Sequence, residues 1–263
     1  VINSFSDYLN LQTDDATLQK ALKLMKQIVL PNLKLGLRKK KDDIKNEYIS
    51  VLAYIVTNSK VFTDLNDMKV LLMKGDQEAD FFFNVNHIQI HRRQRAVKRL
   101  CELAPQLHEN SISHYLIPAI ESWVFCDDEK YRNLCNEVII ALGTLSNFLS
   151  WNQYKALIRR YKSMLKMDSP HLKEIVLVIV NLSVSVKNSL LSLRDDSDGL
   201  PSIRKFPSKL DEPKSFIENE LYPDLTKFLN KRDDETIVAR IPLSEATVNL
   251  ILGLPQDTVV SYL

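Results

Sequence analysis

Glycine is scarce in this chain, with five residues among 263. The usual share of about 7% would give more than three times as many. Nucleotide-binding glycine loops, tight β-hairpins and the nucleophile elbow of hydrolases all need glycine at fixed positions, and none of these patterns occurs in the sequence. The scarcity disfavours the enzyme classes that depend on such turns.

Cysteine is also sparse and shows no paired spacing. Cys101, Cys126 and Cys135 lack the CxxC spacing of zinc or redox sites and alternate with apolar helix positions. We expect them to be reduced thiols in an intracellular protein. Long apolar runs are missing too, because "EIVLVIVNLSVSV" is broken by Asn181 and serines and falls short of the roughly eighteen residues that a membrane helix needs.

Neither sign of charge dominates, since 35 Lys and Arg residues face 33 Asp and Glu residues and leave a net charge of +2. Any affinity for nucleic acid or for an anionic surface must therefore come from local clusters. The first residues, "VINSFSDYLN", are neither a methionine start nor a signal peptide, and the last, "DTVVSYL", stop inside an apolar pattern. We expect the chain to be a piece of a longer protein.

Apolar residues follow helical spacing in successive pairs of segments. From Leu18 to Val29 they recur at i, i+3 and i+4, and after a basic corner the spacing returns in "IKNEYISVLAYIVTNS". Similar pairs begin near residues 111, 151 and 215. Helix pairs of about forty residues in succession are typical of helical solenoids. The sequence predicts an all-α solenoid of HEAT-like antiparallel helix pairs, roughly five in number.

Three prolines stand in matching settings: "VLPNL" at Pro31, "LIPAI" at Pro118 and "LYPDL" at Pro223. Each falls inside the first predicted helix of a pair. Proline in a helix interior removes a backbone hydrogen bond and bends the helix, so the recurrence indicates a repeated shape. The pattern resembles HEAT repeats, whose first helix often carries such a proline.

Two segments interrupt the periodicity. Residues 74–86 are acidic and then aromatic, and residues 188–214 are rich in Ser, Pro, Asp and Lys. We predict HEAT-like repeats over 1–187 with an insertion at 74–86, a flexible linker or insertion at 188–214, and a further repeat over 215–263 that is truncated at its end.

The stretch "NHIQIHRRQRAVKRLCE" is the strongest candidate site. His87 and His91 share one helix face at i, i+4, as two zinc ligands do, but no carboxylate or cysteine completes a metal site and the adjacent arginines repel a dication. We predict no metal and no other cofactor. His87 and His91 remain candidates for contact with RNA or a partner. The cations of the stretch suit RNA phosphates or a partner, or else form a solvated helix face. They are Arg92, Arg93, Arg95, Lys98 and Arg99.

Two further basic groups form a secondary candidate: Arg38, Lys39, Lys40 and Lys41 at a predicted helix corner, and Arg159 and Arg160 along a later helix. A solvated turn is the favoured explanation of the first group, with an RNA contact as the alternative. Trp123 and Trp151 occupy apolar helix phases and are expected in the core. Ser, His and Asp residues form no catalytic arrangement, so we predict no enzyme.

The stretch "DFFFNVNHIQIHRRQRAVKRL", Asp80 to Leu100, resembles the down-regulated-in-metastasis family, as does "RIPLSEATVNLILGLP" near the end of the chain. Phe83 and Gln94 depart from that family's pattern. The resemblance implies a HEAT-repeat scaffold of the small-subunit processome, or 90S pre-ribosome, that associates with a small nucleolar ribonucleoprotein. It also implies a nucleolar location, contacts with pre-ribosomal RNA and assembly factors during 18S rRNA maturation, and no catalytic residues.

Two alternatives remain open from the sequence. HEAT-repeat nuclear transport receptors and adaptors share the fold class and the mixed charge. The helical regulatory region of a large kinase does so too, but it requires a kinase domain elsewhere in the parent chain.

Overall fold

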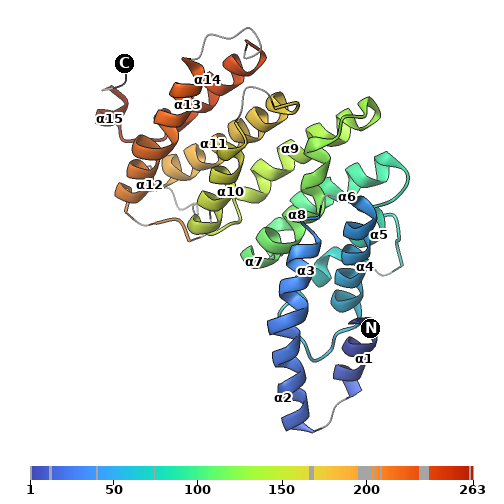
Figure 1. The fold of residues 1–263 in the computed structure, drawn as a ribbon. Coiled ribbons are helices and arrows are strands. Elements are labelled where there is room, and N and C mark those ends of the chain that lie inside the picture. The colour runs from blue at the N-terminus through green and yellow to red at the C-terminus, as the bar shows by residue number, and fades with distance from the viewer. Residues whose placement is uncertain are drawn as a thin grey trace. The chain divides into compact units, whose positions relative to one another are not determined.

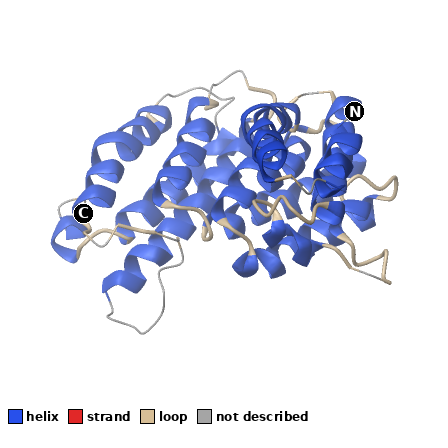
Figure 2. Cartoon of the chain, turned by 90° about the horizontal axis from the view of Figure 1, so that it is seen from below, coloured by secondary structure: helices blue, strands red, loops and turns tan. Residues whose placement is uncertain are grey.

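The computed structural model describes residues 2–11, 14–39, 41–73, 75–165, 169–194, 203, 205–207, 209–230, 237–260 and 262. Regular secondary structure in these residues is helical, without a strand (Figure 2). This confirms the predicted all-α fold of helix pairs. The chain divides into two compact units, residues 1–123 with 128–134 and residues 124–127 with 135–263.

Thirteen helical segments of the described residues lie wholly within the first unit. In chain order they are α1 (Ile2–Leu11), α2 (Asp15–Leu24), the π-helix η1 (Met25–Val29), α3 (Leu30–Gly36), α4 (Asp42–Asn58), η2 (Asn66–Leu71), α5 (Phe81–Asn84), α6 (Ile90–Leu103), η3 (Ala104–Gln106), α7 (Glu109–Ser111), the π-helix η4 (Ile112–Leu116), α8 (Ile117–Glu121) and η6 (Glu129–Tyr131). The segments η5 (Ser122–Phe125) and α9 (Arg132–Ser146) cross the division between the units.

The second unit continues with seven helical segments in the described residues. They are α10 (Trp151–Ser163), α11 (Leu172–Arg194), α12 (Asp211–Phe216), the π-helix η7 (Ile217–Leu221), α13 (Tyr222–Leu229), α14 (Ile237–Leu252) and α15 (Gln256–Val260). Helix α11 lies against α10 and along α14 (Figure 1). Its buried residues Val176, Ile179 and Leu182 make it the apolar centre of the unit.

Each of the three matched prolines lies two residues after the end of a π-helix. Pro31 follows η1, Pro118 follows η4 and Pro223 follows η7, and in each case the helix continues through the proline. In an α-helix the proline ring clashes with the carbonyl four residues earlier, and its nitrogen has no hydrogen to donate. The wider π turn relieves this crowding, because the residue before each proline donates to a carbonyl five residues back. In Figure 1, α2 and α3 form one continuous rod beside α4.

The segment predicted as a linker, 188–214, is helical at both ends. Helix α11 continues to Arg194 and α12 begins at Asp211, so a linker here starts no earlier than residue 195. Ser189, in the first part of this segment, is buried, and its hydroxyl donates to the Ser185 carbonyl and accepts from the amide of Ile203. Residues 195–202, 204 and 208 lie outside the described part of the chain, and the predicted domain boundaries stay predictions.

Helix α11 also corrects the sequence analysis on one point. Among the described residues, its segment Leu172–Leu193 has the length and the mean hydropathy, 1.7, of a membrane span. The interrupting serines do not lower its apolar character much, because hydroxyls such as that of Ser183 donate back to the helix, here to the Ile179 carbonyl at 2.8 Å. The buried core helix of a soluble protein passes the same test, so this is weak evidence for a membrane.

Gly143 allows α9 to approach α11 closely within the second unit. A Cβ atom at this position would lie 2.7 Å from the Asn181 Cβ and 3.3 Å from the Asn181 carbonyl oxygen. Because backbone atoms cannot move aside as a flexible side chain does, any larger residue must push the helices apart.

We therefore expect Gly143→Ala to lower the free energy of unfolding, although alanine is the better helix former. Overpacking costs roughly 1–3 kcal/mol, against a gain of about 1 kcal/mol in helix propensity. Urea denaturation of the chain measures the difference. The control Thr144→Ala gains helix propensity without this contact and should be neutral or stabilising, and a Gly143→Ala variant at least as stable as the wild type would contradict the packing argument.

Candidate nucleic-acid interface

Helix α6 carries the main candidate residues on an amphipathic scaffold. Ala96, Val97 and Leu100 are buried and fix the inner face of the helix. On the opposite side His91, Arg95 and Lys98 are exposed, at the i, i+4 and i+7 positions that follow one helix face. The cation-rich stretch therefore divides into an outer row and side chains that turn back toward the fold.

The acidic and aromatic segment before α6 is part of the core of the first unit. Phe81 and Phe82 are buried and meet edge to face with ring centroids 5.2 Å apart. Asp80 holds the segment in place, since its carboxylate accepts from the Phe83 amide at 2.9 Å and from the Met73 amide at 3.2 Å. The segment predicted as an insertion at 74–86 is thus anchored through its aromatic half, while Lys74 lies outside the described residues.

Glu78, in the acidic half of this segment, pairs with two arginines of α6. One carboxylate oxygen lies 3.1 Å from Nη2 of Arg92, and the other lies 2.9 Å from Nη1 of Arg95. The hydrogen bond from Arg95, together with the charges of both arginines, holds the pKa of Glu78 below its usual value. We name this arrangement the Glu78 bridge.

Arg93 points away from the outer row and serves the fold. Its Nε donates to the His87 carbonyl at 2.6 Å, and its guanidinium lies 5.6 Å from the ring centroids of both Trp123 and Tyr131. Contacts of a guanidinium with aromatic faces are favourable and are stronger where water is excluded. The geometry therefore assigns Arg93 to the packing of the first unit and not to its surface.

Lys45 of α4 lies on the same tryptophan and is buried. Its ammonium donates to the Ser122 hydroxyl and lies 5.7 Å from the Trp123 ring centroid. Burial lowers the pKa of Lys45 to about 8, against the opposing influence of Asp42 and Glu121, and the Arg93 charge lowers it further.

Sequence reasoning missed Lys45, although a signal for it exists. The residue falls at i−4, i−7 and i−11 from Ile49, Leu52 and Val56, which form the buried face of α4. A lysine in phase with an apolar stripe has to bury its amine or extend it past the stripe. Here Ser122 supplies the acceptor.

The two histidines do not form a metal site in the described residues. His87 uses its Nδ1 to accept the Gln89 amide at 3.1 Å, just before α6 begins. Partial burial and the neighbouring Arg92, His91 and Arg93 charges lower the pKa of His87. No group of three or more potential ligands from His, Cys, Asp and Glu gathers anywhere in the part of the chain that the structure describes.

Arg99 completes the α6 candidates. Its side chain is half-buried, and its Nε is buried without a hydrogen bond to any described residue. Of the five cations predicted to face RNA or a partner, Arg95 and Lys98 are exposed and the other three are half-buried, and Arg95 already contacts Glu78.

The secondary group at the helix corner lies between α3 and α4. Arg38, Lys39 and Lys41 are exposed, and Lys41 is the residue at which α4 is capped. Lys40 lies outside the described residues. This group belongs to the first unit, whereas Arg159 and Arg160 belong to the second.

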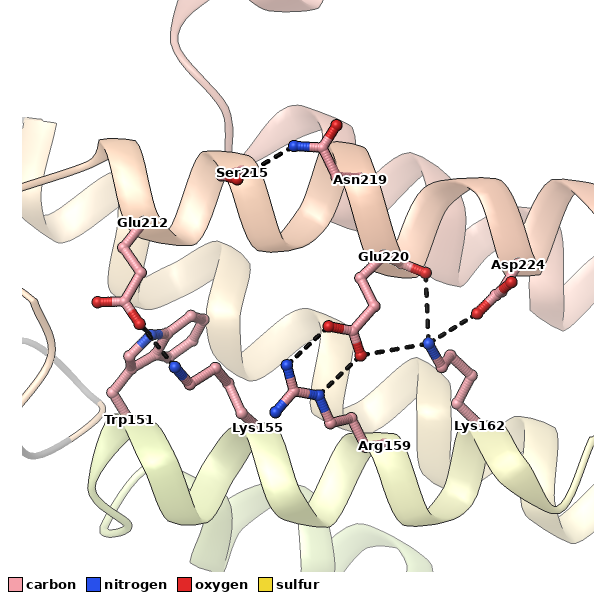
Figure 3. Close-up of polar contacts among 9 residues, drawn as sticks. All are labelled: Trp151, Lys155, Arg159, Lys162, Glu212, Ser215, Asn219, Glu220 and Asp224. Atoms are coloured by element: carbon pink, nitrogen blue, oxygen red, sulfur yellow. Dashed lines mark hydrogen bonds and ion pairs between the residues drawn. The ribbon is translucent and has the colours of Figure 1, made fainter.

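Figure 3 shows that the basic face of α10 meets an acidic face formed by α12, η7 and α13. Arg159 binds Glu220 through two hydrogen bonds of 2.7 Å each, and its guanidinium lies 5.1 Å from the Phe216 ring centroid. Lys162 contacts the same Glu220 at 3.3 Å and Asp224 at 2.7 Å. The hydrogen bonds between the two side chains raise the pKa of the Arg159 guanidinium and lower the pKa of the Glu220 carboxyl.

The same interface continues toward the start of α10 (Figure 3). Glu212 accepts from Trp151 Nε1 at 2.8 Å and from Lys155 Nζ at 2.6 Å. Arg160 lies 5.5 Å from the Tyr161 ring centroid. The cations of α10 that sequence reasoning assigned to a binding surface thus include side chains that join neighbouring helices, and Trp151 and Trp123 are buried as predicted.

We expect Arg93→Ala to destabilise the chain more than Arg95→Ala. The first change removes a hydrogen bond and two aromatic contacts from a part-buried site, for a loss of about 1–3 kcal/mol. The second removes a half-exposed ion pair worth about 0–1 kcal/mol. Chemical denaturation of both variants measures the two losses, and equal losses would refute the structural role of Arg93.

Lys45 should make stability depend on pH in the alkaline range. Folded Lys45 loses its proton near pH 8 and the unfolded lysine near pH 10.5, so the unfolded state binds more protons in between and stability rises with pH. Lys45→Met removes this contribution. Its stability relative to wild type should fall by at most about 3 kcal/mol as the pH rises through that window.

The measurement is the difference in unfolding free energy between wild type and variant at several pH values. Lys39→Met, at an exposed position, controls for loss of an amine. A difference for Lys45→Met that stays constant between pH 7 and pH 10.5 would show that burial does not lower the Lys45 pKa.

Comparison with known proteins gives two relatives along nearly the whole chain, while no protein-family model matches it. A U3 small nucleolar RNA-associated protein 20 from Saccharomyces cerevisiae is 53% identical over 262 residues, which are 100% of this chain and 10% of that protein. The protein of the same name from Schizosaccharomyces pombe is 29% identical over 269 residues, 95% of this chain and 11% of that protein. The chain spans about a tenth of the length of these relatives.

Among the solved structures with some likeness are engineered proteins. A designed armadillo repeat protein has a TM-score of 0.32 with 14% identity and covers 95% of this chain and 100% of its own. A second engineered protein has a TM-score of 0.31 with 15% identity and covers 96% and 97%. Scores this low establish no shared fold. The whole-chain similarity to proteins named for U3 small nucleolar RNA confirms the family resemblance seen in "HIQIHRR".

Proposed function

We propose that this chain is a segment of a non-catalytic scaffold in small ribosomal subunit biogenesis. In this proposal its parent protein organises pre-ribosomal RNA and assembly factors in the small-subunit processome, in the nucleolus, for 18S rRNA maturation. The observation that carries the proposal is the 53% identity over the whole chain to a U3 small nucleolar RNA-associated protein. The names of both relatives mention a small nucleolar RNA and neither mentions nuclear transport, which favours the scaffold over a transport receptor.

The form of the chain supports this proposal. Stacked helix pairs present extended surfaces, and such surfaces suit the binding of long or multiple partners. The outer row of α6, His91, Arg95 and Lys98, is the best-placed RNA contact in the described residues, because these side chains are exposed on one helix face. Lys39 and Lys41 are exposed as well and form a second candidate.

A test of the α6 contact has to spare the core. Deletion of Asp80 to Leu100 would remove Phe81, Val97 and Leu100, which are buried, and would unfold the first unit. Substitutions confined to the outer row avoid this difficulty, and Arg93 is left unchanged because it packs on Trp123.

We expect the double variant Arg95→Gln, Lys98→Gln of the full-length protein to lose crosslinks to pre-ribosomal RNA in cells at the α6 peptide. Each lost phosphate contact weakens binding and flattens its salt dependence. The matched control is Lys20→Gln, Lys23→Gln, which removes two exposed cations with the same i, i+3 spacing from α2. Equal crosslinking of the two double variants at α6 would remove this helix from the RNA-binding surface.

A further inference from the structure

The Glu78 bridge has the geometry of an occupied anion site. Arg92 and Arg95 stand at i, i+3 on α6, and each donates to a different oxygen of one carboxylate, at 3.1 Å and 2.9 Å. A phosphodiester presents two non-bridging oxygens that accept from guanidinium groups in the same way, and arginine is well suited to both anions. The donors of this pair are therefore already directed at the position of one anionic group.

The Glu78 carboxylate, which occupies this site, is held weakly. The side chain of Glu78 is 55% exposed, and those of Arg92 and Arg95 are 21% and 52% exposed. Ion pairs at such exposure contribute little to stability. Water and dissolved anions reach the bridge, so another anion can replace the carboxylate without opening the core.

The rest of the segment does not depend on the Glu78 carboxylate. Asp80 caps α5 through the Phe83 amide, and Phe81 and Phe82 are buried beside it. Asn84 adds hydrogen bonds to the Gln77 and Asp80 carbonyls at 2.6 Å and 2.7 Å. Displacement of the Glu78 side chain therefore leaves the neighbouring anchors of the segment in place.

We propose that Arg92 and Arg95 form a binding site for an RNA backbone phosphate, which displaces the Glu78 carboxylate from the Glu78 bridge. This inference rests on the proposed function, because it requires the parent protein to contact RNA through α6. An acidic protein segment would make similar contacts. RNA fits better because His91, Arg95 and Lys98 extend the exposed row over about two turns of α6, which suits a strand with a phosphate at every nucleotide.

Glu78 thereby sets the affinity of the site. It competes inside the same molecule with any anion that enters the site, so an anion with one contact gains little, whereas a strand that also engages Lys98 gains from the additional contact. Removing the negative charge of Glu78 should tighten RNA binding without creating a new contact.

The experiment uses the full-length protein and a fluorescein-labelled oligouridylate, with binding measured by anisotropy and contacts mapped by crosslinking to peptides. Glu78→Gln should bind about two- to fivefold more tightly than wild type and give more crosslinks at α6. The matched control is Glu102→Gln, which removes one exposed carboxylate from α6 itself. Adding Arg92→Gln and Arg95→Gln to the Glu78→Gln variant should abolish its gain.

Three results would overturn the proposal. Glu78→Gln could bind RNA no more tightly than Glu102→Gln while α6 still crosslinks, in which case the inference fails and the RNA contact of α6 stands. Glu78→Gln could instead gain affinity for a polyglutamate probe and not for RNA, which assigns the site to a protein partner. Absence of α6 crosslinks in wild type and variant alike counts against the RNA role of α6 in both proposals.

Discussion

Proline has no amide hydrogen and needs space around the preceding helical turn, and three rods of this protein are built around that constraint. In α2–η1–α3, in α7–η4–α8 and in α12–η7–α13, a five-residue π turn ends two residues before the proline. Each rod therefore continues past a residue that would otherwise interrupt it. The helices that continue past the prolines pack on later helices, α3 on α4 and α13 on α14, so the packing in each unit depends on the continuous rods.

Several charged side chains of this protein pack or pair with residues of its own fold. Arg93 packs on Trp123, Arg159 binds Glu220 with two hydrogen bonds, and Lys162 bonds to Glu220 and Asp224. A near balance of acidic and basic residues is what such pairing requires. Clusters of cations in the sequence thus overstate the positive surface, and the exposed row of α6 is smaller than the stretch that contains it.

Sequence patterns predicted the helices well because helical spacing and proline placement are local properties. The stretch from Ile90 to Leu103 is the amphipathic helix that its apolar residues indicated. Partners distant in sequence were not accessible in this way, because nothing local links Glu78 to Arg92 and Arg95, or Lys45 to Ser122. The π turns were missed for a different reason: each adds one residue to a turn, which shifts the apolar phase without ending the helix.

The chain contains two tryptophans, and each compact unit holds one. Trp123 is buried near Lys45 and Arg93 in the first unit, and Trp151 is buried against Tyr154 in the second, with its ring stacked at 5.5 Å. Because their surroundings differ, their emission spectra respond to separate events. Replacing either indole with phenylalanine would leave a single tryptophan, which can be excited selectively over the nine tyrosines, so the unfolding of each half becomes visible without any attached label.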